Sequence, residues 1–147
     1  MDFSNLPSGL TIRLSLTDRD ATAFAEKYLN DHNKEIKDLI QQKLKINPDI
    51  TEPKIQFDQD EIHLSAKVGI RFVKANARLT ASVYWNGSSA DVNIKTLEIP
   101  IVTLDASKAN GLIKKPIEDF VGQLQQDFNI LTFCVETGSV SIDAVKK

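Results

Sequence analysis

The chain has 147 residues, 41% hydrophobic and 26% charged, which is the composition of an ordinary globular domain. Eighteen basic and 20 acidic residues give a net charge of −2, which excludes a general electrostatic attraction to nucleic acid and leaves only local patches, such as Lys108, Lys114 and Lys115. A chain of this length buries about two-thirds of its unfolded surface, so we expect a single domain, residues 1–147, with no nucleic-acid partner and a core that needs no disulfide or metal.

The first third of the chain predicts a strand followed by a long helix. Residues 10–16, LTIRLSL, alternate apolar and polar side chains, as a half-buried strand does. Thr17 and Asp20 have the spacing of a helix capping box. Apolar residues at three- and four-residue spacings then predict one amphipathic helix over residues 18–45, about 40 Å long. Its weakest stretch is NDHN, residues 30–33, where a kink or a break is expected.

The middle of the chain predicts a long antiparallel ribbon. After a strand at KIQF, residues 61–85, EIHLSAKVGIRFVKANARLTASVYW, alternate almost without interruption. The inward positions are even from Ile62 to Phe72 and odd from Ala75 to Trp85, so we expect a bulge or a reversal near Val73–Asn76. A single strand of this length would span about 80 Å, which favours a hairpin. NGSSAD, residues 86–91, predicts the next hairpin turn.

The last third predicts a strand, a helix and two terminal strands. Residues 92–101 change phase after Ile94, which implies a bulge. We expect the second helix over residues 114–127, with Pro116 near its first turn. LTFCVE and SVSIDAV then form strands joined by a Thr-Gly turn. Cys134, the single cysteine, lies in an apolar run with no adjacent basic residue, so we expect a buried and unreactive thiol.

The apolar side of the ribbon must be covered, and two helices with one apolar stripe each are available to cover it. The fold class is therefore α+β. The inner stripe is rich in alanine, which suits a strongly curved antiparallel sheet wrapped around the long N-terminal helix, with a second C-terminal helix followed by terminal strands. These alanines are Ala66, Ala75, Ala77 and Ala81. Such a half-pipe either closes on a filled core or leaves an apolar cavity.

The element order resembles that of a known family. The segments that carry the resemblance are LSLTDRDATAFAEKYL, the ribbon of residues 61–85, LEIPIVTL leading into IKKPIEDFVGQL, and the ending GSVSIDAV. They are similar in pattern to small bacterial envelope proteins of the YpmS and LmeA type, which belong to the tubular lipid-binding (TULIP-like) folds. The resemblance implies a curved sheet around a long helix and non-enzymatic lipid binding, with no catalytic residues to carry over.

No catalytic or metal-binding signature stands out in the sequence. His63 lies on the polar side of a predicted strand and is expected to be solvated, and His32 is expected to be a hydrogen-bonded residue at the helix boundary. DQDE, residues 58–61, lacks the glycine and the distal Glu of a calcium loop, and no paired His or Cys spacing suggests zinc. Glycine-rich phosphate loops are also missing from the sequence. We therefore expect no enzyme, no cofactor and no metal.

Two functions follow from these expectations. The first is non-enzymatic binding of a lipid or acyl chain between the long helix and the curved sheet, by ligand-lining residues Phe24, Tyr28, Phe72, Ala77, Ala81 and Phe120. The alternative is a filled-core scaffold or adaptor that acts through its polar sheet face or an edge strand. An enzyme would be favoured only if His32 or His63 met a carboxylate in a cleft.

The sequence restricts the binding partners and the cellular compartment of the protein only in part. A hydrophobic small molecule or a membrane surface stays open as a partner, and the sequence does not predict the oligomeric state. No stretch reaches the roughly 20 apolar residues of a membrane span, and the start has no signal-peptide features. The chain as written is expected in the cytoplasm, or in the cell envelope if a signal or an anchor was removed.

Overall fold

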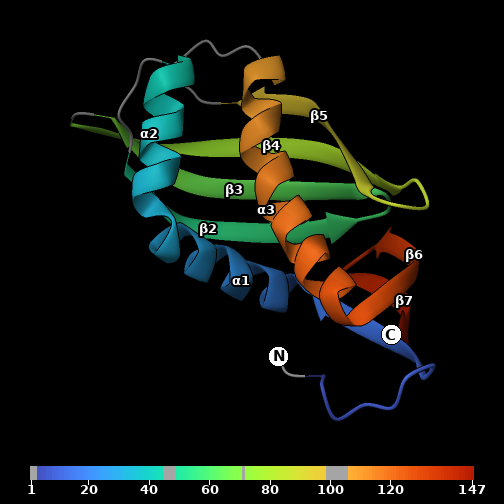
Figure 1. Ribbon diagram of the computed structural model, residues 1–147. Coiled ribbons are helices and arrows are strands. Elements are labelled where there is room, and N and C mark those ends of the chain that lie inside the picture. The colour runs from blue at the N-terminus through green and yellow to red at the C-terminus, as the bar shows by residue number, and fades with distance from the viewer. Residues whose placement is uncertain (1–2, 45–48, 71, 99–105) are drawn as a thin grey trace.

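The computed structural model describes residues 3–44, 49–70, 72–98 and 106–147, and in this part the chain forms three helices and seven strands (Figure 1). In chain order they are β1 (Thr11–Thr17), α1 (Asp18–Asp31), α2 (Asn33–Leu44), β2 (Asp49–Asp58), β3 (Glu61–Ile70), β4 (Val73–Trp85), β5 (Ala90–Glu98), α3 (Ala106–Asp127), β6 (Phe128–Glu136) and β7 (Ser139–Lys146). The fold is α+β with two antiparallel sheets.

The two sheets divide the strands between them. The larger sheet has the strand order β2-β3-β4-β5, and the smaller has the order β1-β7-β6. Helix α1 packs against β2, while α3 packs against β5, so the helices cover one face of the larger sheet (Figure 1). The turn between β6 and β7 joins the sheets, because Gly138 N donates to Phe57 O at 3.1 Å and Asp60 N donates to Val135 O at 3.0 Å.

The expected half-pipe around one long helix is wrong. The strands form two separate sheets, and neither is strongly curled. The expected helix of residues 18–45 is divided at His32, whose φ of −119° and ψ of 20° end α1 before α2 begins. The weak NDHN stretch is therefore a break. The capping box at the start of α1 is confirmed: Thr17 Oγ1 accepts from Asp20 N at 3.2 Å, and Asp20 Oδ2 accepts from Thr17 N at 3.1 Å.

The hairpin prediction is confirmed, but the reversal lies earlier than expected. Ile70 faces Val73 across the turn, and the same register continues without a shift to Glu61 and Ser82. The chain therefore reverses between Ile70 and Val73, just before the expected interval of residues 73–76. A two-residue loop places even residues of one strand opposite odd residues of the next, so the change of parity needs no bulge.

Register shifts do occur in three other strands: in β2 between Thr51 and Lys54, in β5 and in β6. The shift in β6 corrects a prediction. The pairing of β4 with β5 shifts between Thr80 and Ala81, which confirms a bulge after Ile94. In β6 the register shifts between Ile130 and Thr132, which turns Phe133 and Val135 inward and leaves Cys134 exposed. The expected burial of Cys134 is therefore wrong, because one extra residue exchanges the two faces of the strand.

The second helix is longer than expected. Helix α3 begins at Ala106 and not at Lys114, so Pro116 lies in its interior and not in its first turn. Proline has no backbone N–H, so the helix forgoes one internal hydrogen bond at this position. The predicted strand positions at residues 99–101 lie outside the described residues.

One core joins the helices to both sheets. Its buried members include Ala21 of α1, Val121 and Leu124 of α3, Ala81 of the larger sheet and Ile142 of the smaller. Burial of a valine, leucine or isoleucine side chain contributes about 1.5–3 kcal/mol, which makes this cluster the main source of stability.

Helix α1 also closes one edge of the larger sheet, the one formed by β2. Thr22 Oγ1 accepts from Ile55 N at 2.9 Å and donates to Ile55 O at 3.3 Å, while Asp18 Oδ1 accepts from Phe57 N at 2.7 Å. These bonds occupy backbone groups of β2 that an unpaired edge strand would offer to another strand.

Candidate functional site

The apolar face of the larger sheet is buried at both ends and half-buried in the middle. Near the turn between β2 and β3, the buried residues are Phe57, Ile62, Ala81 and Val83. Val68 of β3 and Ile40 of α2 are also buried, but they lie outside that main core cluster. Between these regions lie the half-buried residues Leu64, Ala66, Ala77 and Leu79.

The middle of the face carries the smallest side chains. Ala66 of β3 and Ala77 of β4 lie directly opposite each other, and we call them the central alanine pair. Each contributes a single methyl group, so the sheet face offers little volume to the helices that cover it. Cores are normally packed to crystal-like density. A half-buried alanine pair between two buried regions is therefore a place where apolar packing is incomplete.

Helix α2 is held over the far end of this face by a salt bridge. Lys37 Nζ lies 2.9 Å from Asp49 Oδ1, and Asp49 is the first residue of β2, opposite Gly69 of β3. Hydrogen bonding from Lys37 lowers the pKa of the Asp49 carboxyl, which keeps the pair charged. The face is thus covered at this end by α2 and at the other end by the main core.

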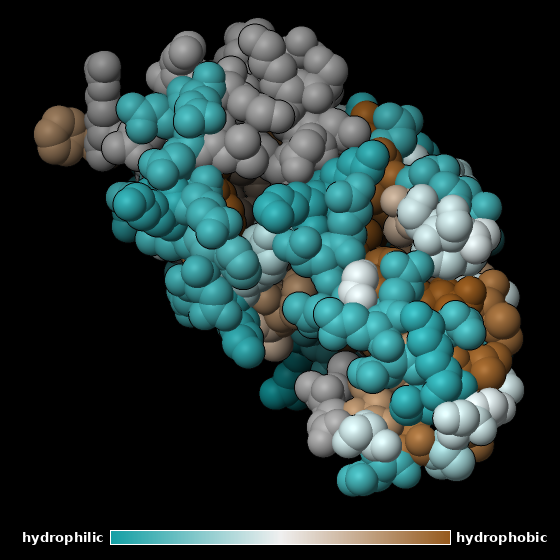
Figure 2. All heavy atoms as spheres, viewed as in Figure 1, coloured by the Kyte–Doolittle hydropathy of each residue, from teal (hydrophilic) through white to brown (hydrophobic). Residues whose placement is uncertain are grey.

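Side chains join α1 to α3 above the sheet. Phe24 and Phe120 meet edge to face, with ring centroids 5.6 Å apart, and Tyr28 Oη donates to Asp119 Oδ2 at 3.1 Å. Burial and this hydrogen bond raise the pKa of Tyr28 to about 12, so its hydroxyl stays a neutral donor at neutral pH. The His32 ring stacks on Tyr28 at 4.1 Å. Figure 2 shows hydrophobic atoms in brown and tan between the teal surfaces of the α1–α2 pair and α3.

The structure brings together three of the six predicted lining residues and places a fourth on the sheet face. Phe24, Tyr28 and Phe120 form the contact between the helices, and Ala77 belongs to the central alanine pair. Ala81 lies inside the main core with 0% of its surface exposed. Phe72 is 103% exposed at the turn between β3 and β4, so its prediction as a lining residue is wrong.

Sequence reasoning omitted several residues of this region. Leu64 and Leu79 share the inward parity of the alanines, so the alternating pattern contained the signal for them. Asp119 had no such signal, because its partner Tyr28 is 91 positions away in the chain. A hydrogen bond over that separation depends on how α1 and α3 are placed on the sheet.

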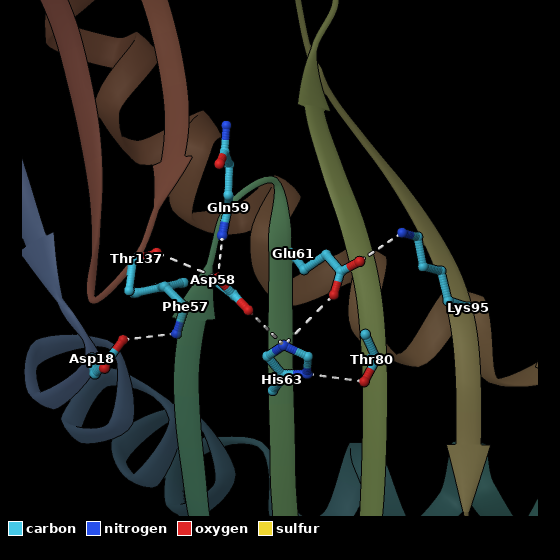
Figure 3. A network of polar contacts seen from close by, with 9 residues as sticks. All are labelled: Asp18, Phe57, Asp58, Gln59, Glu61, His63, Thr80, Lys95 and Thr137. Carbon is cyan, nitrogen blue, oxygen red and sulfur yellow. Dashed lines mark hydrogen bonds and ion pairs between the residues drawn. The ribbon is translucent and has the colours of Figure 1, made fainter.

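A second group of polar residues lies where β2, β3, β4 and β5 run side by side, and Figure 3 shows it. His63 Nδ1 lies 3.0 Å from Thr80 Oγ1, its direct neighbour across the strands. His63 Nε2 lies 3.6 Å from Glu61 Oε2 and 4.0 Å from Asp58 Oδ2. Glu61 Oε1 also accepts from Lys95 Nζ at 2.6 Å, which links β3 to β5.

The order hydroxyl, imidazole, carboxylate in this group is that of a general-base assembly, but the geometry does not favour catalysis. Both carboxylates are beyond hydrogen-bond distance from the ring, and His63, Asp58 and Glu61 are 39%, 62% and 29% exposed. His63 occupies the polar side of the strand, as expected. The group is better explained as cross-strand pairs that stabilise the sheet, each contributing about 0.2–1 kcal/mol.

Among the residues that the structure describes, no three His, Cys, Asp or Glu side chains are grouped so as to hold a metal ion. None of the helices, over the same residues, combines the length and the apolar character needed to cross a bilayer.

Comparison with known proteins gives little guidance. No protein-family model matches the chain, and no curated protein matches it. A crystal structure of a lipopolysaccharide binding protein aligns at 10% sequence identity with a TM-score of 0.31, and the alignment covers 96% of this chain and 51% of that one. This chain thus spans about half the length of that protein. A likeness this weak carries no argument about fold or function, and the resemblance to the YpmS and LmeA type stays a prediction.

Proposed function

We propose that the protein binds an acyl chain or a similar apolar ligand above the central alanine pair, between the helices and the larger sheet. The observation that carries this proposal is the half-buried middle of an otherwise buried apolar face. Each methylene group that leaves water contributes about 0.8 kcal/mol, so a few methylene groups against Leu64, Leu79 and the alanine pair would give measurable affinity.

The groups around this region suit a ligand with an apolar body and a polar end. The sheet side is aliphatic, and the ring pair of Phe24 and Phe120 adds aromatic surface. Polar atoms lie at the margin, where the Tyr28 hydroxyl meets the Asp119 carboxylate and Lys115 Nζ lies 3.8 Å from that carboxylate. A few polar groups beside a mostly apolar surface are typical of small-molecule sites.

A filled-core scaffold or adaptor is the second candidate. It is favoured by the large polar face of the sheet, where Arg78 is exposed and forms no salt bridge with a described residue. Because α1 closes the edge at β2, an edge-strand partner would use another edge, such as β1 or β5. In this case, charge reversal at Arg71 or Arg78 should abolish partner binding while the protein stays free of lipid.

The first test is whether the purified protein carries a ligand. Native mass spectrometry is compared with the denatured mass, and an organic extract of the same sample is analysed for lipid. A mass difference of several hundred daltons that is recovered as lipid supports the proposal. A bare mass, together with failure to bind added fatty acid or phospholipid, supports the filled-core scaffold.

The second test places the ligand. In Ala77→Phe a ring is added to the central alanine pair, and fatty-acid binding should be lost. In Asn76→Phe the same ring is added to the preceding residue of β4, which is exposed, and binding should be kept. If Ala77→Phe retains ligand as well as Asn76→Phe does, the proposed site is wrong.

A further inference from the structure

The closed end of the β3–β4 hairpin carries a fully exposed aromatic side chain. Phe72 is 103% exposed, whereas the other exposed large hydrophobic side chains among the described residues reach 55% at most. Its neighbour Val73 is 49% exposed. Figure 1 shows this end of the hairpin projecting beyond the helices. We call Phe72 and Val73 the hairpin tip.

The tip is held out by regular strand pairing. Ile70 pairs with Val73, and the ladder continues without a register shift through Ala66 and Ala77. A two-residue loop on a paired ladder leaves the backbone little freedom to fold the ring back onto the protein. The hairpin therefore holds the Phe72 ring in water. Transfer of the ring from water into an apolar environment would lower the free energy.

The sequence around the tip is basic, although the chain as a whole is not. Between Glu61 and Asp91 there is no acidic residue, whereas the net charge of the chain is −2. The basic residues of this interval are Lys67, Arg71, Lys74 and Arg78. Lys67 pairs with Glu52 at 3.0 Å, but neither Lys74 nor Arg78 forms a salt bridge with a described residue. The carboxylate of Asp49 lies two strands away, close enough for the Lys74 charge to lower its pKa, but it forms its salt bridge with Lys37. The tip thus combines an exposed ring with an exposed lysine that is in no salt bridge with a described residue.

We propose that the hairpin tip docks on an anionic lipid surface, with the Phe72 ring in the boundary between headgroups and acyl chains and Lys74 near the phosphates. A stable protein interface needs about 800 Å² from each partner, which one ring and part of a valine do not supply. A bilayer requires no such matched area, because exposed apolar groups and basic residues each add to the binding. The size and the charge of the tip therefore favour a membrane surface.

This inference goes beyond the proposed ligand site and can fail separately from it. The tip consists of Phe72 and Val73, while the ligand site is centred on Ala77, four residues beyond Val73 along β4. Phe72→Ser should leave fatty-acid binding unchanged. Ala77→Phe should leave vesicle binding unchanged. The two variants thus distinguish failure of one proposal from failure of the other.

The test is co-sedimentation of the full chain with phosphatidylcholine vesicles that contain phosphatidylserine, compared with vesicles of phosphatidylcholine alone. Binding should need the anionic lipid and weaken with added salt. Phe72→Ser should reduce the partition coefficient about tenfold, and Lys74→Glu about fivefold or more. Two controls should bind as the wild type does: Leu131→Ser, which removes an apolar side chain that is 53% exposed on the other sheet, and Lys27→Glu, which reverses an exposed charge on α1.

Three outcomes would overturn the proposal. The first is that the wild-type protein does not bind anionic vesicles at low ionic strength. The second is that Phe72→Ser binds them as well as the Leu131→Ser control does. The third is that sedimentation velocity reveals self-association that Phe72→Ser abolishes, in which case a second copy of the chain and not a membrane occupies the tip.

Discussion

Two alanines on the same face of β4 should respond oppositely to the same substitution. Ala77 is half-buried in the central alanine pair, whereas Ala81, four residues further along the strand, has 0% of its surface exposed in the main core. Both side chains point toward the helices, so Ala77→Phe and Ala81→Phe test the local packing with one chemical change. The proposed ligand site requires space above Ala77 and none above Ala81.

The expected magnitudes follow from area and packing. A phenyl ring adds about 100 Å² of apolar surface, so burying half of it at Ala77 would stabilise the protein by about 1 kcal/mol. At Ala81 the same ring has no space and should cost about 1–3 kcal/mol by overpacking. The two variants should therefore differ by at least about 2 kcal/mol, which is about 4–8 °C in Tm for a chain of this size.

Thermal unfolding followed by circular dichroism measures this difference. The protein is delipidated first, because bound ligand would raise the Tm of the wild type alone. Ala77→Phe should match or exceed the wild-type Tm, and Ala81→Phe should fall below it. If Ala77→Phe is destabilised as much as Ala81→Phe is, the space above Ala77 is already filled and the scaffold is the better explanation.

Three further predictions concern the stability of the fold. Thr22→Val should lower the free energy of unfolding by about 1–3 kcal/mol in urea denaturation, because the backbone N–H and C=O of Ile55 both lose their hydrogen-bond partner. Thr17→Ala should cost about 1 kcal/mol in the same assay by opening the capping box, and Thr17→Ser should restore most of it. The Arg13 guanidinium lowers the pKa of Asp143 below 3.8, and hydrogen bonding from Thr17 lowers that of Asp20. Their stabilisation is present above the unfolded pKa and is lost as the pH falls through the lower folded values. The urea concentration at the unfolding midpoint should therefore decrease as the pH is lowered below about 4. This decrease should be less steep in Asp143→Asn than in the wild type.

Part of the candidate site could be predicted from local pattern. The alternation of β3 and β4 places the alanines on the apolar face, and the three- and four-residue spacing of α1 places Phe24 and Tyr28 on one stripe. Phe72 shared the even parity of that face, but parity describes a strand, and Phe72 belongs to the loop that ends it. At a turn the backbone leaves the sheet, so the alternation no longer decides which side of a residue is covered.

The sequence by itself determined most features that depend on neighbours in the chain. These include the capping box at Thr17, the antiparallel hairpin of β3 and β4, the bulge after Ile94, and the strand–turn–strand ending closed at Gly138, whose φ of +84° suits glycine. Each rests on residues a few positions apart, so the physical cause is contained in a short segment.

Only the tertiary structure decided the features that depend on distant contacts. The chain forms two sheets because β1 pairs with β7, its partner from the other end of the chain, and not with β2. The bulge in β6 exposes Cys134, and the placement of α1 against α3 joins Tyr28 to Asp119. Pairings between residues so far apart in the chain depend on the burial of the whole core. They cannot be predicted from any short segment of the sequence.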